Sequence, residues 1–284
     1  MMIKTLTETE FAILQALRTY RYLTAAQLLR IGVSKNKSRL YTVLRSLTSG
    51  KRPFVAKMKH GVMPGRGRIP DSHYLTKRGA ALLAEALCID SSEVAYPKST
   101  IPIRTHFFHR LHCIDCEITV RLWAEKNDIS VDYYHSYFDV TGANRGGTTG
   151  KRRALTKIDL KNRPGLIPDA SFQLTWPDGT ARLFLLEVHN QNRSKRITDK
   201  LAEYRFAIGD GAINKQFDYP HAPRILTIFE NEKWMHLALQ RMRESGLFDE
   251  TYAPFFFLNT LEGIESNFKD GWFKIVKNKK TSLY

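Results

Sequence analysis

The sequence contains few cysteines, few acidic residues relative to basic ones, and no long apolar run. Its three cysteines are an odd number in 284 residues and lie in apolar surroundings: Cys88, Cys113 and Cys116. We therefore expect a reducing, cytoplasmic compartment and no structural disulfide. No stretch reaches the roughly 18 consecutive apolar residues of a membrane-spanning helix. The first twenty residues carry charges where a secretory signal would be apolar. Membrane insertion is not expected.

Several catalytic motifs are also absent. The chain has no Walker-type phosphate loop, no GxGxxG turn and no GxSxG nucleophile elbow, which disfavours nucleotide-driven and acyl-transfer chemistry. Hydrophobic residues nevertheless make up 43% of the chain, so it can bury a core, and its length suits two ordinary domains.

The charge is strongly positive and unevenly distributed. The 44 Lys and Arg residues exceed the 28 Asp and Glu residues, for a formal charge of +16. Residues 1–95 hold 16 of the basic residues and 6 of the acidic ones. Such an excess favours a polyanionic partner. Nucleic acid binding is therefore expected mainly of the first third of the chain.

That first third has the order of a helix-turn-helix. Thr7 begins an S/T-x-x-E capping pattern, Thr24 opens a second short helix, and Gly32 permits a turn. Ser34 is expected to cap a third helix over residues 35–49. A basic third helix in this position is typical of DNA recognition. Its side chains expected to contact DNA are Lys35, Lys37, Arg39, Tyr41 and Arg45.

The next segment predicts a β-hairpin with a basic tip. Residues 54–58 and 72–75 have strand character, and the Gly/Pro loop between them carries Arg66 and Arg68. Such a wing can reach phosphates or a minor groove, and a helix starting near Thr76 completes the pattern. We interpret residues 1–91 as a winged helix-turn-helix domain, although winged helices can also bind proteins.

Residues 92–104 contain two prolines and show no periodicity, so they are expected to be a linker. Residues 105–284 alternate between helix and strand patterns, which predicts an α/β domain with a mixed sheet. Its expected elements are a helix at 105–125, a strand at 129–140, a basic loop at 141–165, a hairpin at 168–189, a helix at 197–208, a strand at 224–229, a helix at 231–244 and a strand at 255–258.

The hairpin's turn sets its register. Trp-Pro-Asp-Gly favours a type I turn followed by a left-handed glycine, which pairs Trp176 with Thr180. Counting outward, Asp169 lies opposite Glu187. The same register pairs Ala170 with Leu186, Phe172 with Phe184 and Pro168 with Val188, which places apolar residues together on one face. Turn chemistry and hydrophobic pattern therefore agree.

The opposite face gathers Asp169, Ser171, Glu187 and His189. Directly opposed residues have Cβ atoms about 4.5–5.5 Å apart, and two carboxylates at that range repel each other unless a cation or a proton lies between them. A hard cation such as Mg²⁺ suits this arrangement. The alternative is that nearby lysines or arginines neutralise the pair.

With Pro168-Asp169 followed by Glu187-Val188-His189, the chain resembles the PD-(D/E)XK nuclease superfamily. Together with the N-terminal pattern it is similar to the replication-relaxation family of plasmid and mobile-element proteins, which includes mobilisation relaxases with a restriction-endonuclease-like core. Three other phrases carry the resemblance: Leu75-Thr76-Lys77-Arg78-Gly79, His109-Arg110-Leu111-His112-Cys113-Ile114-Asp115, and Lys200-Leu201-Ala202-Glu203-Tyr204.

The resemblance implies that Asp169 and Glu187 hold Mg²⁺ or Mn²⁺, with Glu117 on the preceding helix as a weaker candidate. The departure is His189, which stands where the family has a lysine that orients water. Lys200 on the next helix could supply that ammonium from a displaced position. Without either group, the fold could serve DNA binding alone.

Two further sets have ordinary interpretations as well as functional ones. His109, His112, Cys113 and Cys116 share one face of one helix, which cannot surround an ion by itself, so we expect this stripe to pack on the sheet and keep only His112 as a site member. Arg193 and Arg196 follow the hairpin and could bind phosphate or lie in a solvated loop.

Two functions remain open from the sequence. One is a metal-dependent DNA endonuclease or nickase, and the other is a non-catalytic DNA-binding replication or transcription factor. The expected partner of either is double-stranded DNA at a specific plasmid or mobile-element site. A homodimer or other mobilisation and replication proteins are further possible partners.

Overall fold

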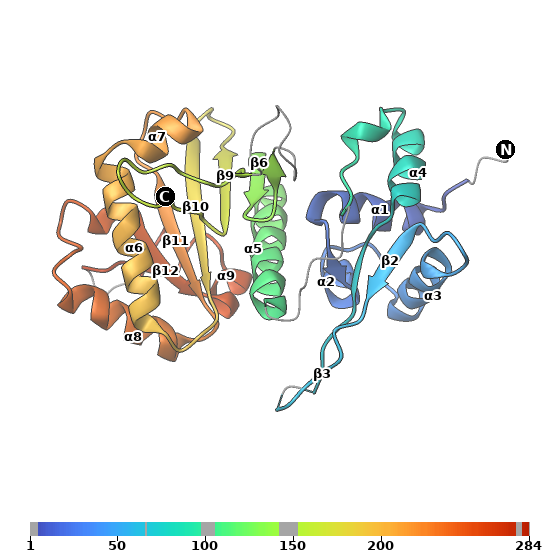
Figure 1. Cartoon of the computed structure of the whole chain (residues 1–284), viewed down its shortest axis with the longest axis horizontal. Helices are drawn as coiled ribbons and strands as arrows, with labels where there is room; N and C mark the ends of the chain where they lie inside the picture. Colours follow the sequence, from blue (N-terminus) through green and yellow to red (C-terminus); the bar gives the residue numbers. More distant parts are fainter. Residues whose placement is uncertain (1–4, 66, 98–105, 142–152, 277–279, 284) are drawn as a thin grey trace. The chain divides into compact units, whose positions relative to one another are not determined.

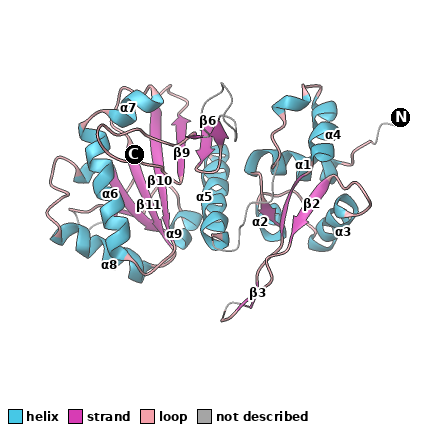
Figure 2. Cartoon of the chain, in the orientation of Figure 1, coloured by secondary structure: helices cyan, strands magenta, loops and turns pink. Residues whose placement is uncertain are grey.

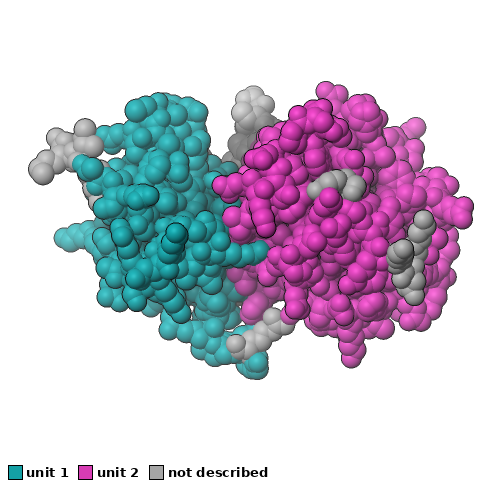
Figure 3. All heavy atoms as spheres, turned by 180° about the vertical axis from the view of Figure 1, so that it is seen from behind, with its two compact units in different colours: residues 1–107 teal, residues 108–284 magenta. Residues whose placement is uncertain are grey.

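The computed structural model describes residues 5–65, 67–97, 106–141, 153–276 and 280–283. The chain divides into two compact units, residues 1–107 and 108–284 (Figure 3). The first unit continues past residue 91 with a 3₁₀ turn at Ser91–Glu93 and with Val94 buried. Residues 98–104 of the expected linker lie outside the described residues. Among the described helices, none is long and apolar enough to cross a bilayer.

The first unit combines helices with a small sheet (Figure 2). The helices are α1 (Glu8–Tyr20), α2 (Ala25–Arg30), α3 (Lys37–Thr48) and α4 (Lys77–Leu87). The strands β1 (Leu23–Thr24), β2 (Val55–Met58) and β5 (Ser72–Leu75) form a three-stranded sheet in the order β1-β5-β2. A two-stranded hairpin, β3 (Val62–Met63) and β4 (Gly67–Arg68), lies between β2 and β5 in the chain.

Capping residues define most of these helix starts. The Thr7 side chain accepts a hydrogen bond from the Glu10 backbone, and Thr24 forms a second capping box. Both predicted starts are therefore confirmed, as is the left-handed turn at Gly32, where φ is +77°. The predicted cap of the third helix is wrong. Asn36, not Ser34, accepts from the Arg39 backbone at 3.0 Å, because Ser34 is engaged in a local turn with Asn36.

The predicted pairing of the strands at 54–58 and 72–75 is confirmed. Val55 lies opposite Leu75 and Met58 opposite Ser72. The short strand β1 at the sheet edge has no clear sequence signal, because two residues are too few to show a period. Of the two arginines expected at the hairpin tip, Arg66 lies outside the described residues.

The second unit is built on a seven-stranded mixed sheet in the order β14-β13-β12-β11-β10-β9-β6. Its strands are β6 (Ser130–Ser136), β9 (Ala170–Thr175), β10 (Ala181–His189), β11 (Arg224–Phe229), β12 (Phe256–Thr260), β13 (Trp272–Phe273) and β14 (Lys280–Thr281). The helices are α5 (Phe107–Lys126), α6 (Ser194–Gly209), α7 (Ala212–Phe217), α8 (Glu232–Glu244) and α9 (Leu261–Ser266), with a 3₁₀ turn at Ala253–Phe255.

The strand directions follow from the connections. β9 runs antiparallel to both β6 and β10, and a tight turn after Trp176 joins it to β10. β11 runs parallel to β10 after the helical crossover through α6, and β12 runs parallel to β11. The predicted mixed sheet is confirmed, while α7, α9, β13 and β14 were not predicted. Much of the predicted loop at 141–165 lies outside the described residues; the described parts include β7 (Val140–Thr141) paired with β8 (Arg153–Ala154).

Helices cover both faces of this sheet (Figure 1). One core lies between the sheet and α6 and α8, and includes Leu183 and Leu185 of β10. The other lies between the sheet and α5 and α9, and includes Phe184 and Leu186. Because side chains alternate along a strand, β10 is buried on both sides. A polar residue on this strand therefore has to find its partners inside the protein.

The predicted hairpin register is confirmed. Phe172 lies opposite Phe184 and Ala170 opposite Leu186. The turn closes with a hydrogen bond from the Trp176 backbone to Thr180 and with Gly179 at a φ of +82°. The Asp169 backbone donates to Leu186 at 3.0 Å, so Asp169 enters the sheet beside the end of β10.

We predict that Gly79→Ala destabilises the first unit. A Cβ at this position of α4 would lie 2.0 Å from the Phe54 carbonyl oxygen, which is backbone and cannot rotate away. Alanine normally stabilises a helix by about 1 kcal/mol relative to glycine, but the overlap should instead cost roughly 1–3 kcal/mol. Thermal unfolding would measure the change. The matched control is Glu85→Ala on the exposed face of α4, and equal stability of the two variants would contradict the prediction.

Candidate functional site

The polar residues on the hairpin meet side chains from two helices. Asp169 directly precedes β9, and Glu187 lies near the end of β10. Lys200 comes from α6, which follows β10 in the chain, and His109 comes from α5, some sixty residues before the hairpin. Three separate elements thus supply the groups around the two carboxylates.

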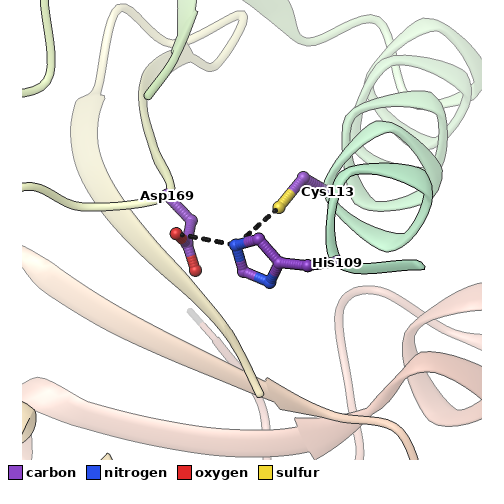
Figure 4. Close-up of side chains that lie close together, drawn as sticks. All are labelled: His109, Cys113 and Asp169. Carbon is purple, nitrogen blue, oxygen red and sulfur yellow. Dashed lines mark hydrogen bonds and ion pairs between the residues drawn. The ribbon is translucent and has the colours of Figure 1, made fainter. Parts of the chain in front are cut away.

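Asp169 is buried and held at both carboxylate oxygens. The Val188 backbone N–H donates to its Oδ2 at 2.8 Å, and His109 Nε2 lies 3.1 Å from its Oδ1 (Figure 4). Burial raises the pKa of this carboxyl, but the Lys200 ammonium and the His109 contact outweigh it and lower the pKa to about 2. Asp169 is therefore a carboxylate at neutral pH.

Glu187 is more deeply enclosed, with 2% of its surface exposed. The Lys200 ammonium donates to its Oε2, and the Tyr204 hydroxyl donates to its Oε1 at 2.5 Å. Burial raises the pKa of Glu187 to about 8 against the opposing effect of Lys200. At Lys200, burial lowers the pKa, but Glu187 and Asp169 raise it overall, so the group remains an ammonium. One buried ammonium thus contacts Glu187 and lowers the pKa of Asp169.

His189 lies at the end of β10 with 8% of its surface exposed. Its ring meets Phe229 edge to face, with ring centroids 5.6 Å apart. Burial, together with the nearby Arg196, lowers the pKa of this imidazole to about 4. His189 is therefore neutral at physiological pH and provides no positive charge beside the two acidic residues.

A third group near the carboxylates is the α5 pair His109 and Cys113. Cys113 Sγ lies 3.8 Å from His109 Nε2, and donor atoms of His109, Cys113 and Asp169 all lie within 4.8 Å of one another. We call these three residues the His-Cys-Asp cluster. The sequence placed His109 and Cys113 in a stripe expected to pack on the sheet, and Cys113 and Cys116 do pack there. The contact of His109 with Asp169 was missed, because no local pattern joins residues sixty positions apart.

The remaining predicted site members are Glu117, His112, Arg193 and Arg196. Glu117 is buried on α5, where its Oε1 accepts a hydrogen bond from Arg121 Nε at 2.9 Å. His112 is half-buried on the same helix and does not belong to the His-Cys-Asp cluster. Arg193 and Arg196 are exposed at the first turn of α6. Neither Glu117 nor His112 is thus joined to Asp169 by the contacts described above.

The residues expected to contact DNA in the first unit lie on the solvent side of α3 or directly before it. Apolar residues Leu40, Leu44 and Leu47 are buried, and the polar positions between them are exposed. The exposed set is Lys35, Lys37, Arg39, Tyr41 and Arg45. Arg68 on β4 is also exposed and lies 3.5 Å from Asp71.

Comparisons with models of protein families, with curated proteins and with solved structures found no match to this chain.

We predict that His189 makes folding sensitive to mild acid. Its folded pKa of about 4 lies below the ordinary value of 6.5, so the unfolded chain binds more protons between these values. Stability should fall as the pH drops from about 6.5 to 4, by at most about 1.4 kcal/mol per pH unit because one proton is involved.

Denaturant unfolding of wild type and His189→Gln at pH 7 and pH 5 tests this. Relative to wild type, His189→Gln should be more stable at pH 5 than it is at pH 7. His221→Gln, at an exposed position, is the control and should follow wild type. An unchanged difference for His189→Gln would show that the imidazole is not held neutral.

Proposed function

We propose that this protein is a DNA-binding protein of plasmid or mobile-element replication or mobilisation, and that its second unit is a divalent-metal-dependent DNA nickase or endonuclease. The observation that carries the proposal is the position of Lys200. The Lys200 ammonium contacts Glu187 and lowers the pKa of Asp169. It therefore supplies, from α6, the positive charge that His189 lacks.

The DNA-binding part of the proposal is supported by the first unit. Three helices precede β2, a hairpin joins β2 to β5 in the chain, and the solvent side of α3 is basic. This is the order of a winged helix, in which the third helix enters the major groove and the hairpin reaches the backbone. The charge excess of residues 1–95 agrees with this role.

The nuclease part is supported by the order of elements in the second unit. α5, β6, the β9–β10 hairpin, α6 and β11 follow one another, with β11 parallel to β10. This is the order that the PD-(D/E)XK resemblance implies. Asp169 directly before β9 and Glu187 near the end of β10 would then be its two acidic residues.

The residues present fit a divalent ion at Asp169, which is ionised and buried and acts electrostatically on Glu187. An ion bound there would activate water and neutralise phosphate charge. Lys200 can stabilise charge that develops on the phosphate, while Tyr204 and Lys200 hold Glu187 in place. Arg193 and Arg196, exposed nearby in the chain, can bind flanking phosphates.

The alternative is a non-catalytic DNA-binding factor. It is favoured by the two donors on Glu187, since Lys200 and Tyr204 already occupy both carboxylate oxygens. An ion would have to displace one of them to bind Glu187. In this alternative the buried network only stabilises the fold.

We predict that Arg39→Ala combined with Arg45→Ala weakens DNA binding. Loss of two phosphate contacts should lower the slope of log affinity against log salt concentration by about 2. Fluorescence anisotropy on the gene's own flanking DNA over a range of salt concentrations measures both affinity and slope. Lys77→Ala, at an exposed position of α4, is the control. Wild-type affinity that does not change with salt would rule out DNA as the partner.

We predict metal-dependent nicking of supercoiled plasmid carrying that flanking DNA. Wild type should produce open circles with Mn²⁺ or Mg²⁺ and none with EDTA, whereas Glu187→Ala should be inactive. Lys200→Met should be roughly 100-fold slower, because it removes one donor to the developing charge.

The matched control for Lys200→Met is Lys195→Ala, at a position 77% exposed on the same helix, which should retain full activity. Unfolding curves establish that each variant is folded. If wild type binds the DNA but leaves it intact with every metal, the non-catalytic factor is the correct assignment.

A further inference from the structure

The His-Cys-Asp cluster joins an imidazole, a thiol and a carboxylate from two elements. We propose that His109, Cys113 and Asp169 bind one zinc-class transition-metal ion in a three-ligand site with an open fourth position. The proposal rests on the proposed function for the use of the ion, and binding itself needs neither DNA nor catalysis.

The distances within the cluster are close to those of a tetrahedral site. Zinc lies about 2.0–2.2 Å from nitrogen and oxygen ligands and about 2.3 Å from sulfur, so the edges of its tetrahedron are about 3.4 Å from N to O and about 3.6 Å from N to S. The cluster has 3.1 Å between His109 Nε2 and Asp169 Oδ1 and 3.8 Å between His109 Nε2 and Cys113 Sγ. All three donors lie within 4.8 Å of one another, so shifts of side chains are enough to close the site.

The cluster also avoids the geometric problem of a metal site built from α5 alone. Four ligands along one helix cannot surround an ion, because successive turns stack in a line. Here α5 provides only His109 and Cys113, spaced four residues apart on one face, and Asp169 approaches from the sheet (Figure 4). Two ligands from a helix and one from a second element leave the fourth direction free for water or phosphate.

Neighbouring groups already orient the ligands. Asp169 Oδ2 is held by the Val188 backbone N–H, which leaves Oδ1 to face His109. Such supporting hydrogen bonds are typical of metal ligands. His109 Nε2 needs a proton to donate to Asp169, and an ion would replace that proton. The His109 side chain is 21% exposed, so the ion can enter from solvent.

The donor set determines which ion binds. Mg²⁺ prefers six oxygen ligands, whereas a thiolate and an imidazole favour zinc, cobalt and related ions. Glu187 is not needed as a ligand, since Lys200 and Tyr204 occupy its oxygens. The ion is therefore expected beside the two-carboxylate site that the family resemblance implies. The two sites share only Asp169.

Cobalt binding to the metal-free full chain tests the proposal. One equivalent of Co²⁺ should produce the visible bands of a four-coordinate ion and a sulfur-to-cobalt charge-transfer band in the near ultraviolet. Cys113→Ser and Cys113→Ala should abolish the charge-transfer band. His109→Gln and Asp169→Asn should each weaken binding by roughly 10-fold or more.

Cys116→Ser is the matched control, because Cys116 is equally buried on α5 but outside the cluster. It should keep both the band and the affinity, and a large excess of Mg²⁺ should not displace the cobalt. Unfolding curves show that the Cys113 variants are folded.

The proposal is overturned if wild type shows no charge-transfer band, or if the band persists in both Cys113 variants. Cobalt binding without any nicking activity would remove the nuclease and leave the metal site standing. Nicking by a protein that does not bind cobalt at Cys113 would remove the metal site and leave the nuclease standing.

Discussion

The pairing of β9 with β10 is the constraint on which the site depends. In this register Asp169 enters the sheet beside Glu187 and Val188, where helices cover both faces. Two buried carboxylates so close together need a compensating charge. Lys200 provides it from α6, and its contact with Glu187 connects the crossover helix to the sheet at that point.

The same burial explains why the two carboxylates differ. At Asp169 the Lys200 ammonium and the hydrogen bonds from His109 and Val188 outweigh burial, and the pKa falls to about 2. At Glu187 the loss of solvent outweighs the opposing effects of Lys200 and Tyr204, and the pKa rises to about 8. Burial lowers the pKa of the His189 imidazole, which therefore stays neutral. One low-dielectric environment thus shifts the pKa of each group in a direction that its neighbours decide.

Much of the local structure could be predicted, because its causes lie within a few residues. The capping side chains of Thr7 and Thr24, the turn before Gly179 and the alternation along the hairpin are all short-range features. The error at Ser34 is of the same kind, since Ser34 and Asn36 are both good caps and a local turn decided between them. The short elements α7, α9, β13 and β14 have too few residues to show a period.

The sequence by itself determined the basic first third, the helix and strand order, and the opposition of Asp169 and Glu187, because composition, periodicity and turn chemistry are local properties. Only the tertiary structure decided that Lys200 contacts Glu187 and that His109 and Cys113 approach Asp169. These contacts depend on how α5 and α6 pack against the sheet, and that packing is a compromise among many apolar contacts that no short segment encodes.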